Sequence, residues 1–360
     1  MKKINLGVIF GGVSTEHEIS ILSAASILKN LDRERYNILP IGITKNGEWR
    51  LCPSLVDNNL CVDTWNTDGV PVTLSVDRER HGLYSTDGAC AFYPLDCVFP
   101  VLHGMNGEDG TIQGLFEIAG IPYVGCDTAA SAVSMDKSLT KLVVRETGVR
   151  QADWVLVRAR ELQKDMDTVI ARVEAKFKYP VFVKPARCGS SVGIGKAKSR
   201  EALSAALLDA ARYDPKILVE EFIDGREIET AVIGNEDARV SVCGEILPAR
   251  EFYNYEAKYL DETSRTCVPA HLPENVSEET RAAALKIYEA LDCTGLARVD
   301  FFVDRHDMSV VFNEINTIPG FTDISMYAKL FAHCGVSFTE LLNRLVLYAR
   351  GADAERRKYK

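Results

Sequence analysis

The sequence lacks several features that mark whole classes of protein. No stretch of its 360 residues approaches the run of about 20 apolar residues that a membrane span needs, so we expect no membrane partner. No secretory h-region opens the chain and its ten cysteines include no Cys-x-x-Cys pair, which indicates reduced thiols and a cytoplasmic location. Clustered lysine and arginine are scarce, and the net charge of -9 with a pI near 5.4 argues against a nucleic-acid partner.

The residues that are present are typical of a globular α/β protein. Hydrophobic residues make up 46% of the chain and charged residues 26%. The length exceeds what one hydrophobic core usually serves, so we expect two or three packed units. In the first unit, which ends near residue 126, an apolar strand stops at Gly11-Gly12, and further strands alternate with helices; this order predicts a parallel sheet with crossover helices. The expected strands are residues 4–10, 35–43 and 97–102, and the expected helices are 19–31 and 110–119. Residues 46–95 are expected to form strands and loops without an assigned function.

Two further units are expected after residue 126, with boundaries at 127–221 and 222–360. The second should contain a helix after Met135-Asp136-Lys137, another at residues 200–212, and strands at 179–184 and 216–221. The third should contain a metal-binding hairpin and helices at 278–291 and 337–350. The charged segment 355–360 is expected to be a solvated tail.

The hairpin carries the clearest chemical signal in the chain. Glu314 and Asn316 are two residues apart on one expected strand, so they project from the same face, and the preceding strand brings Asp300 beside them. Carboxylate and amide oxygens are hard ligands that suit Mg²⁺, which proteins usually share with nucleotide phosphates. The pattern therefore predicts ATP binding. A polar hairpin rim solvated by water is the alternative interpretation.

A second pattern indicates a phosphate-binding loop. Lys184 stands at the end of an expected strand, and Gly189, Ser190 and Ser191 follow it. Glycines allow close approach of backbone N–H groups to phosphate oxygens, and the lysine supplies a positive charge. The segment does not have the Walker A pattern, and an ordinary glycine-serine loop is the alternative.

An acidic edge strand follows this loop. Its backbone at residues 218–223, which includes Phe222 and Ile223, could hydrogen-bond an adenine together with Glu220, and Glu227 could meet ribose hydroxyls. The alternative is a buried strand with an exposed carboxylate pair.

Taken in order, these patterns are similar to those of the ATP-grasp enzymes, and four further segments resemble one family among them. The segments are GGVSTEHEIS at 11–20, HGMNGEDG at 103–110, SMDK at 134–137 and YEAKY at 255–259, and they resemble D-alanine:D-alanine ligases over nearly the whole chain. The resemblance implies an ATP-grasp α/β fold, with an N-terminal Rossmann-like parallel-sheet domain and two α+β subdomains that sandwich ATP. It also implies a homodimer that joins two D-alanines through a D-alanyl phosphate for peptidoglycan precursor synthesis and cell-wall biogenesis.

The resemblance implies a role for each matching residue. Lys137 and Lys184 would bind ATP phosphates, with Ser191 beside them. Two Mg²⁺ ions, for which Mn²⁺ can substitute, would be held by Asp300, Glu314 and Asn316. The tetrahedral intermediate would be stabilised by Arg298 and the backbone N–H of Gly320.

The resemblance also implies how the two D-alanines and a lid are bound. Glu16 would pair with the ammonium of the first D-alanine and would join Ser190 and Tyr259 in a triad that closes the lid. The second D-alanine's carboxylate would meet Lys258 and Ser325. His103 would lie near the first D-alanine, although a satisfied structural histidine is the alternative for that residue.

The choice of second substrate depends on few positions. Relatives that make D-alanyl-D-serine commonly have an arginine where this chain has Met326, an apolar residue suited to a methyl group, and lactate makers lack a lid tyrosine like Tyr259. D-alanyl-D-alanine is therefore the expected product, with D-alanyl-D-serine or D-alanyl-D-lactate as alternatives. A non-catalytic nucleotide sensor should have lost a metal ligand or Arg298, and none is missing.

Overall fold

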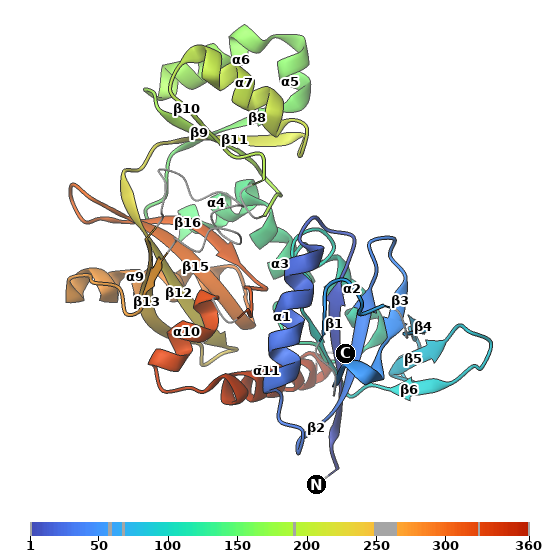
Figure 1. Ribbon diagram of the computed structural model, residues 1–360. Coiled ribbons are helices and arrows are strands. Elements are labelled where there is room, and N and C mark those ends of the chain that lie inside the picture. The colour runs from blue at the N-terminus through green and yellow to red at the C-terminus, as the bar shows by residue number, and fades with distance from the viewer. Residues whose placement is uncertain are drawn as a thin grey trace.

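The computed structural model describes residues 2–56, 60–66, 69–189, 192–247, 265–322 and 325–358. The N-terminal unit is built on a seven-stranded sheet with the order β6-β5-β4-β3-β2-β1-β7 (Figure 1). β1 (Ile4–Gly11) pairs in parallel with β2 (Tyr36–Ile43) and with β7 (Cys97–Pro100), as expected. The other strands all pair antiparallel, so the expectation of a parallel sheet holds for these three strands only. The antiparallel strands are β3 (Trp49–Leu51), β4 (Val70–Leu74), β5 (Gly82–Ser85) and β6 (Phe92–Pro94), with a short 3-10 helix η1 (Pro53–Val56) between the first two.

The turn after β1 needs glycine. Gly11 has a φ of 89°, and a Cβ placed there would lie 2.2 Å from the carbonyl oxygen of Ile43 on the neighbouring strand. The chain can therefore leave the sheet at this point and begin α1 (His17–Asn30), which packs on β1. The unit is completed by α2 (Thr111–Ala119).

The second unit has a four-stranded antiparallel sheet with the order β10-β9-β11-β8. Helices α5 (Ala159–Lys164), α6 (Met166–Lys176) and α7 (Arg200–Ala210) cover one face of it (Figure 1). Apolar side chains alternate along the strands and pack under these helices, which is the pattern of a sheet that is covered on one side. The strands are β8 (Trp154–Arg158), β9 (Val181–Pro185), β10 (Gly195–Ala197) and β11 (Lys216–Glu221).

The third unit has a five-stranded antiparallel sheet with the order β14-β13-β12-β15-β16. Its strands are β12 (Gly225–Gly234), β13 (Arg239–Leu247), β14 (Arg265–Cys267), β15 (Gly295–Asp304) and β16 (Val310–Asn316). The helices are α9 (Glu274–Ala290), α10 (Met326–His333) and α11 (Phe338–Lys358).

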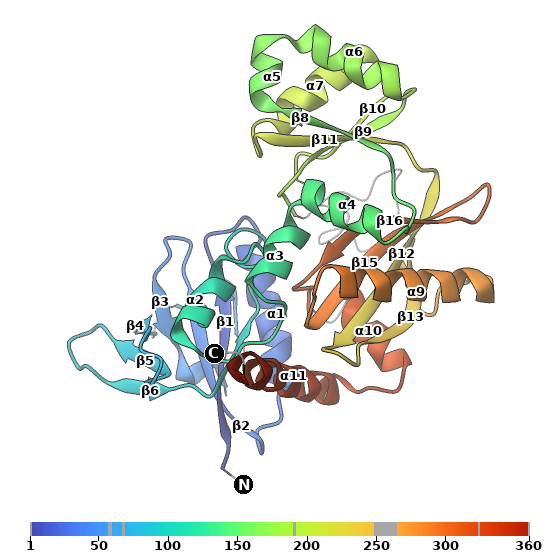
Figure 2. The ribbon, with the colours of Figure 1, turned by 180° about the vertical axis from the view of Figure 1, so that it is seen from behind.

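Two helices between the first and second units, α3 (Thr128–Met135) and α4 (Lys137–Glu146), pack with the third. Ala130 of α3 and Val144 of α4 share a hydrophobic cluster with strands β12, β15 and β16 and with α9. Both views show α4 between the four-stranded and five-stranded sheets (Figures 1 and 2). The helix therefore links two units, and the division of the chain at residues 126 and 221 stays a prediction.

The C-terminal segment differs from the sequence expectation. Instead of ending near residue 350, α11 continues to Lys358 and crosses to the N-terminal unit (Figure 2). There Arg356 Nη1 donates to the Tyr123 hydroxyl at 3.4 Å and Arg357 Nη2 to the Gly120 carbonyl at 3.1 Å. The expected tail is therefore helical as far as Lys358, and Arg356 and Arg357 have partners far away in the sequence. Arg357 and Lys358 are exposed, as a solvated tail would be.

No helix in the described ranges is both long enough and apolar enough to cross a membrane. All ten cysteines fall in the described ranges, and none of them is in a disulfide.

Candidate active site

The predicted hairpin forms at one edge of the five-stranded sheet. In its register Asp300 lies opposite Glu314, and Arg298 lies opposite Asn316. The prediction that Asp300 folds back beside the Glu-x-Asn segment is therefore confirmed. On the other side of β15, Glu229 of β12 lies opposite Asp300, so three carboxylates form a row across three strands. Sequence reasoning missed Glu229, although its spacing of two from Glu227 could have indicated a shared face.

Arg298 provides the positive charge that pairs with two of these carboxylates. Its Nε and Nη2 atoms donate to the two carboxylate oxygens of Asp300 at 2.8 and 2.7 Å, and its Nε lies 3.2 Å from Oε2 of Glu229. Burial alone would lower the pKa of Arg298, but the charges of Asp300 and Glu229 outweigh it and raise that pKa well above its usual range. The guanidinium therefore stays charged and is held in a fixed orientation.

The donor set of the hairpin fits a metal that is shared with a substrate. Asn316 Nδ2 donates to Oδ2 of Asp300 at 3.1 Å, which turns the amide oxygen of Asn316 away from that carboxylate. No group of three or more His, Cys, Asp or Glu side chains in the described part of the chain is arranged as a metal site. Two carboxylates and an amide make a smaller set, which is typical of Mg²⁺ that completes its shell with phosphate oxygens and water.

Two lysines from the neighbouring elements converge on β16. Lys137, the first residue of α4, has its Nζ 3.4 Å from Glu314 Oε2 and donates to the Cys188 carbonyl at 3.0 Å. Lys184, on β9, donates to Oδ1 of Asn313 at 3.1 Å. The two predicted phosphate-binding lysines therefore meet the predicted metal strand.

Glu220 lies behind these lysines and is only 4% exposed. Its carboxylate pairs with Lys184 at 2.7 Å and with Lys141 at 3.0 Å. Burial would raise the pKa of Glu220, but the two lysines outweigh it and lower that pKa to about 2. The alternative of an exposed carboxylate pair was wrong for Glu220. Sequence reasoning also missed Lys141, although it follows Lys137 by one helical turn.

The edge that should meet adenine continues from Glu220. Phe222 follows β11, and its ring stacks on Phe182 with centroids 6.0 Å apart, while Lys196 Nζ lies 3.9 Å from the centre of the Phe222 ring. Ile223 is half-buried, and Glu227 stands near the start of β12. Phe222 and Ile223 thus lie between β11 and β12, and Glu227 lies within β12.

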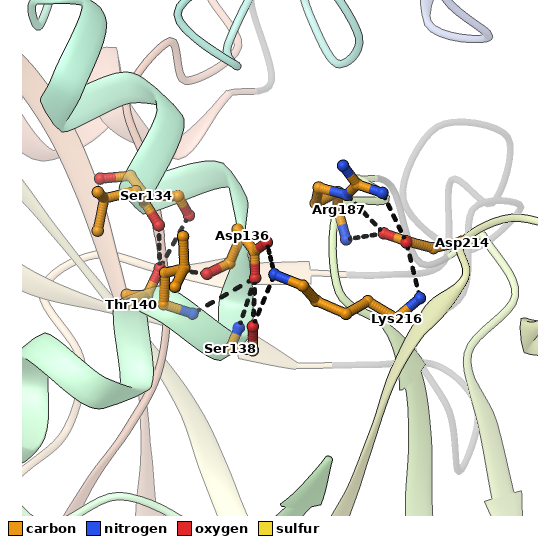
Figure 3. A network of polar contacts seen from close by, with 9 residues as sticks. Ser134, Asp136, Ser138, Thr140, Arg187, Asp214 and Lys216 are labelled. Carbon is orange, nitrogen blue, oxygen red and sulfur yellow. Dashed lines mark hydrogen bonds and ion pairs between the residues drawn. The ribbon is translucent and has the colours of Figure 1, made fainter. Parts of the chain in front are cut away.

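A polar network connects the start of α4, which carries Lys137, with the segment that follows β9, the strand that carries Lys184 (Figure 3). Asp136 caps α4 by accepting from the Ser138 and Leu139 amides at 3.1 and 3.3 Å, and it pairs with Lys216 of β11. Asp214, which is 2% exposed, accepts from the backbone amide of Lys216 at 2.9 Å. It also accepts from the amide, Nε and Nη2 of Arg187 at 2.9, 3.0 and 2.9 Å. The start of α4 and the segment after β9 are thus joined through β11.

A second cluster of charged side chains lies on the N-terminal unit. Glu16, which is 7% exposed, has its Oε2 so close to Gly104 and Gly189 that a Cβ at either position would lie within 2.6 or 2.8 Å of it. Glu108 accepts from the Gly104 amide at 2.7 Å. Burial and the nearby charge of Glu16 raise the pKa of Glu108 to about 8. Sequence reasoning missed Glu108, although it lies within the HGMNGEDG segment at 103–110.

His103 connects this cluster to the turn after β16. Its Nδ1 lies 3.0 Å from the carbonyl oxygen of Ile318, and its Nε2 lies 3.1 Å from Oγ of Ser23. Burial lowers the pKa of His103, which favours the neutral ring. Both ring nitrogens have protein partners, so the structure supports the alternative of a structural histidine.

In the turn after β16, Ser325 Oγ accepts from the Thr322 amide at 3.0 Å, and a Cβ on Gly320 would lie 3.0 Å from that oxygen.

Comparisons with known proteins agree with this geometry. The family model described as D-ala D-ala ligase N-terminus matches residues 5–126, and the model described as D-ala D-ala ligase C-terminus matches residues 143–347. A D-alanine–D-alanine ligase from Caldicellulosiruptor bescii is 49% identical over 362 residues, which cover 100% of this chain and 99% of that protein. The chain belongs to the D-ala D-ala ligase family.

Two solved structures of ligases are also similar over their whole length. The D-alanine-D-alanine ligase from Coxiella burnetii has a TM-score of 0.88 and 36% identity, with 100% of this chain and 97% of that chain covered. A D-Ala:D-Ser ligase from Enterococcus faecalis has a TM-score of 0.86 and 38% identity, with 97% of this chain and 100% of that chain covered. The expected family and the ATP-grasp α/β fold class are confirmed.

Some residues that the ligase resemblance singled out are not brought into the site or lie outside the described ranges. Met326 is 4% exposed and packs in the core, where a Cβ on Gly244 of β13 would lie 2.6 Å from its sulfur atom. Its role in substrate choice stays a prediction. Ser190, Ser191, Lys258 and Tyr259 lie outside the described residues, so their roles stay predictions too.

Proposed function

We propose that this member of the D-ala D-ala ligase family joins two D-alanines, with ATP, to make D-alanyl-D-alanine for peptidoglycan precursors, and so serves cell-wall biogenesis and cell shape. The observation that carries the proposal is the convergence of Lys137, Lys184 and the Arg298–Asp300 pair on strand β16. Positive charge for a polyphosphate, carboxylates for a metal and a fixed guanidinium are the components that carboxylate activation and amide formation require.

The reaction proceeds in two balanced steps. The first D-alanine's carboxylate oxygen attacks the γ-phosphorus of ATP, and the bond to the β-phosphate oxygen breaks, giving D-alanyl phosphate and ADP. The amine of the second D-alanine then attacks the acyl carbon, and inorganic phosphate leaves as the amine loses a proton. Water must be kept out between the steps because it would hydrolyse the acyl phosphate.

Each group of residues has a proposed role in these steps. Lys137 and Lys184 hold the β- and γ-phosphates, and Asp300, Glu314 and Asn316 would hold two Mg²⁺ ions, or Mn²⁺ in their place. The metal ions, when bound, neutralise charge on the transferred phosphoryl group. The nucleotide's adenine and ribose would contact the segment from the end of β11 to the start of β12. Glu220, Phe222 and Ile223 are proposed for the adenine, Glu227 for the ribose and Ser191 for the phosphates.

The amino-acid substrates would lie between the N-terminal unit and the turn after β16. Glu16 pairs with the ammonium of the first D-alanine, and His103 keeps the turn at Ile318 in place, through its 3.0 Å contact. Arg298 and the Gly320 amide donate to the oxyanion of the tetrahedral intermediate. Lys258 and Ser325 would bind the acceptor's carboxylate, with Met326 behind it, and a lid closed by Ser190, Tyr259 and Glu16 would exclude water.

The second candidate product is D-alanyl-D-serine. It is favoured by the 38% identity to the E. faecalis D-Ala:D-Ser ligase, because the same fold supports both acceptors. An apolar acceptor pocket rejects an added hydroxyl only weakly.

One assay tests the proposal against this alternative. The purified protein would be incubated with ATP and Mg²⁺, with D-alanine, D-serine or D-lactate alone and in pairs, while phosphate and product mass are recorded. We expect D-alanyl-D-alanine from D-alanine alone. A mixed product that dominates over D-alanyl-D-alanine when D-alanine and D-serine are equimolar would favour the alternative, and ATP hydrolysis without any condensed product would contradict both.

We also propose that the protein works in the cytoplasm as a homodimer on small-molecule substrates. Ten cysteines without a disulfide and the metabolite substrates support the location. Light scattering during gel filtration tests the assembly: a mass near twice 39.8 kDa is expected, and a mass near 39.8 kDa would contradict it.

A further inference from the structure

Three buried charges form a chain from α4 to β9. The two carboxylate oxygens of Glu220 face different ammonium groups: Oε1 lies 3.0 Å from Lys141 Nζ, and Oε2 lies 2.7 Å from Lys184 Nζ. The side chains of the three residues are 2%, 5% and 10% exposed in the order Lys141, Glu220, Lys184. Water therefore screens this chain little, and each charge acts strongly on the next.

This row of three charges directs the Lys184 side chain toward β16. Lys184 and Glu220 project from the same face of the four-stranded sheet, because Lys184 lies opposite Leu218, two residues before Glu220. The Lys184 ammonium also donates to Asn313 Oδ1 at 3.1 Å, next to Glu314 in the sequence. An ammonium has three N–H donors, so these two partners leave one donor for a phosphate oxygen.

Lys141 and Lys184 share one carboxylate, Glu220, so the charge of Glu220 cannot cancel both of theirs. Besides Glu220, Lys141 donates to the Ala152 carbonyl at 3.2 Å, which carries no net charge. Burial lowers the pKa of Lys141, Glu220 opposes that effect, the nearby charge of Lys184 adds to it, and Glu221 opposes it weakly; the net direction is down. Two ammonium groups around one buried carboxylate leave a surplus positive charge, and a polyphosphate beside Lys184 would compensate it.

We propose that Lys141 is a positioning residue for the polyphosphate of the nucleotide. Through Glu220 it fixes the direction of Lys184, and it supplies the surplus charge that the phosphates neutralise. Lys137 and Lys141, one turn apart on α4, thus serve the phosphates by two routes: Lys137 directly and Lys141 through Glu220. The inference rests on the proposed function for the identity of the nucleotide.

The test replaces Lys141 by methionine, which keeps the chain length and removes the charge. We expect Lys141→Met to weaken ADP binding, measured by calorimetry, and to raise the KM for ATP, each by about tenfold or more, the scale of one charge-assisted hydrogen bond. The KM for D-alanine should change by less than about twofold, because the amino-acid site is not part of this chain of contacts. A matched control is Lys176→Met: this lysine of the same unit pairs with Asp153 at 3.6 Å, is 41% exposed, and should leave ADP binding unchanged.

Two further variants test the route through Glu220. If Lys141 acts through that carboxylate, adding Lys141→Met to Glu220→Gln should weaken ADP binding by less than about twofold beyond Glu220→Gln alone. Lys141→Met alone leaves the Glu220 carboxylate without one of its two partners and could fail to fold. The double variant has no carboxylate at position 220, so its comparison with Glu220→Gln can still be made. A tenfold further loss in the double variant, or wild-type ADP affinity in a folded Lys141→Met, would overturn the proposal. ADP binding is measured without D-alanine, so a wild-type protein that binds ADP but makes no dipeptide would overturn the proposed function alone.

Discussion

The ammonium of Lys137 lies 3.4 Å from the carboxylate of Glu314, so the first residue of α4 touches the strand that carries the predicted metal ligands. The same ammonium donates to the Cys188 carbonyl at 3.0 Å, in the segment that leads into the predicted phosphate-binding loop. Lys137 of α4 therefore contacts both β16 and the segment before the predicted loop. A phosphoryl group bound there would meet all three elements at once.

Replacing Glu314 by glutamine should abolish ligation and leave the fold intact. Under the proposed function Glu314 is shared between two Mg²⁺ ions, and a neutral amide cannot replace a carboxylate in that role. The substitution also removes the ion pair with Lys137. Dipeptide formation and the melting temperature would be measured together. Glu274→Gln, at an exposed position at the start of α9, is the control. Turnover near that of the wild type would rule out Glu314 as a metal ligand.

Arg298→Lys should lower kcat by about 10²-fold, the scale of one lost oxyanion donor. Lysine keeps the positive charge, but it cannot reproduce the two parallel hydrogen bonds to Asp300 at 2.8 and 2.7 Å, so its ammonium would not be aimed as the guanidinium is. Steady-state kinetics would be compared with Arg305→Lys, at an exposed arginine just after β15. An effect on KM with kcat unchanged would contradict an oxyanion role.

Glu108→Gln should change how the free energy of unfolding depends on pH. The pKa of Glu108 is raised from 4.5 to about 8 by burial and by Glu16, so the folded protein holds a proton there that the unfolded chain has released. This contribution to stability is therefore lost as pH rises from about 4.5 to about 8. Urea unfolding across that range should show a smaller decline with rising pH in Glu108→Gln than in the wild type. Parallel curves for the two proteins would show that Glu108 ionises normally, and Glu79→Gln, at an exposed carboxyl, should follow the wild type.

Met326→Arg should destabilise the protein before it alters substrate choice. The side chain is 4% exposed and packs against Gly244, so an arginine would bury an unpaired charge and lower the free energy of unfolding by about 3 kcal/mol or more. Met326→Leu, which conserves volume, should stay close to the wild type. Unfolding curves and the ratio of kcat/KM for D-serine and D-alanine would be measured for both. A stable arginine variant that prefers D-serine would show that position 326 reaches the acceptor.

The local parts of the site could be predicted from the sequence. The alternation of side chains along a strand is enough to put Glu314 and Asn316 on one face, and a short hairpin can only bring Asp300 beside them. The apolar run before Lys184 likewise predicts a strand with this lysine at its end. The turn at Gly11 was also predictable, because a strand that must leave a sheet sharply needs a residue that tolerates positive φ.

The rest depends on partners that are distant in the sequence. No local pattern shows that Lys141 on α4 faces Glu220 on β11, or that Glu229 lies opposite Asp300. The short strands β3 to β6 turn the first sheet into a mixed one through pairings that their brief apolar runs do not specify. Similarly, Arg357 at the charged end of α11 donates to the Gly120 carbonyl, a partner that no local pattern indicates.

The central claim is that the chain activates D-alanine as an acyl phosphate before it forms the peptide bond. The most direct measurement uses D-alanine labelled with heavy oxygen in its carboxylate, together with ATP and Mg²⁺, and follows the label by mass spectrometry of the phosphate and the dipeptide. Attack of the carboxylate on the γ-phosphorus predicts that each phosphate released carries one labelled oxygen, with one dipeptide made per phosphate. Unlabelled phosphate, or phosphate released without dipeptide, would contradict the account.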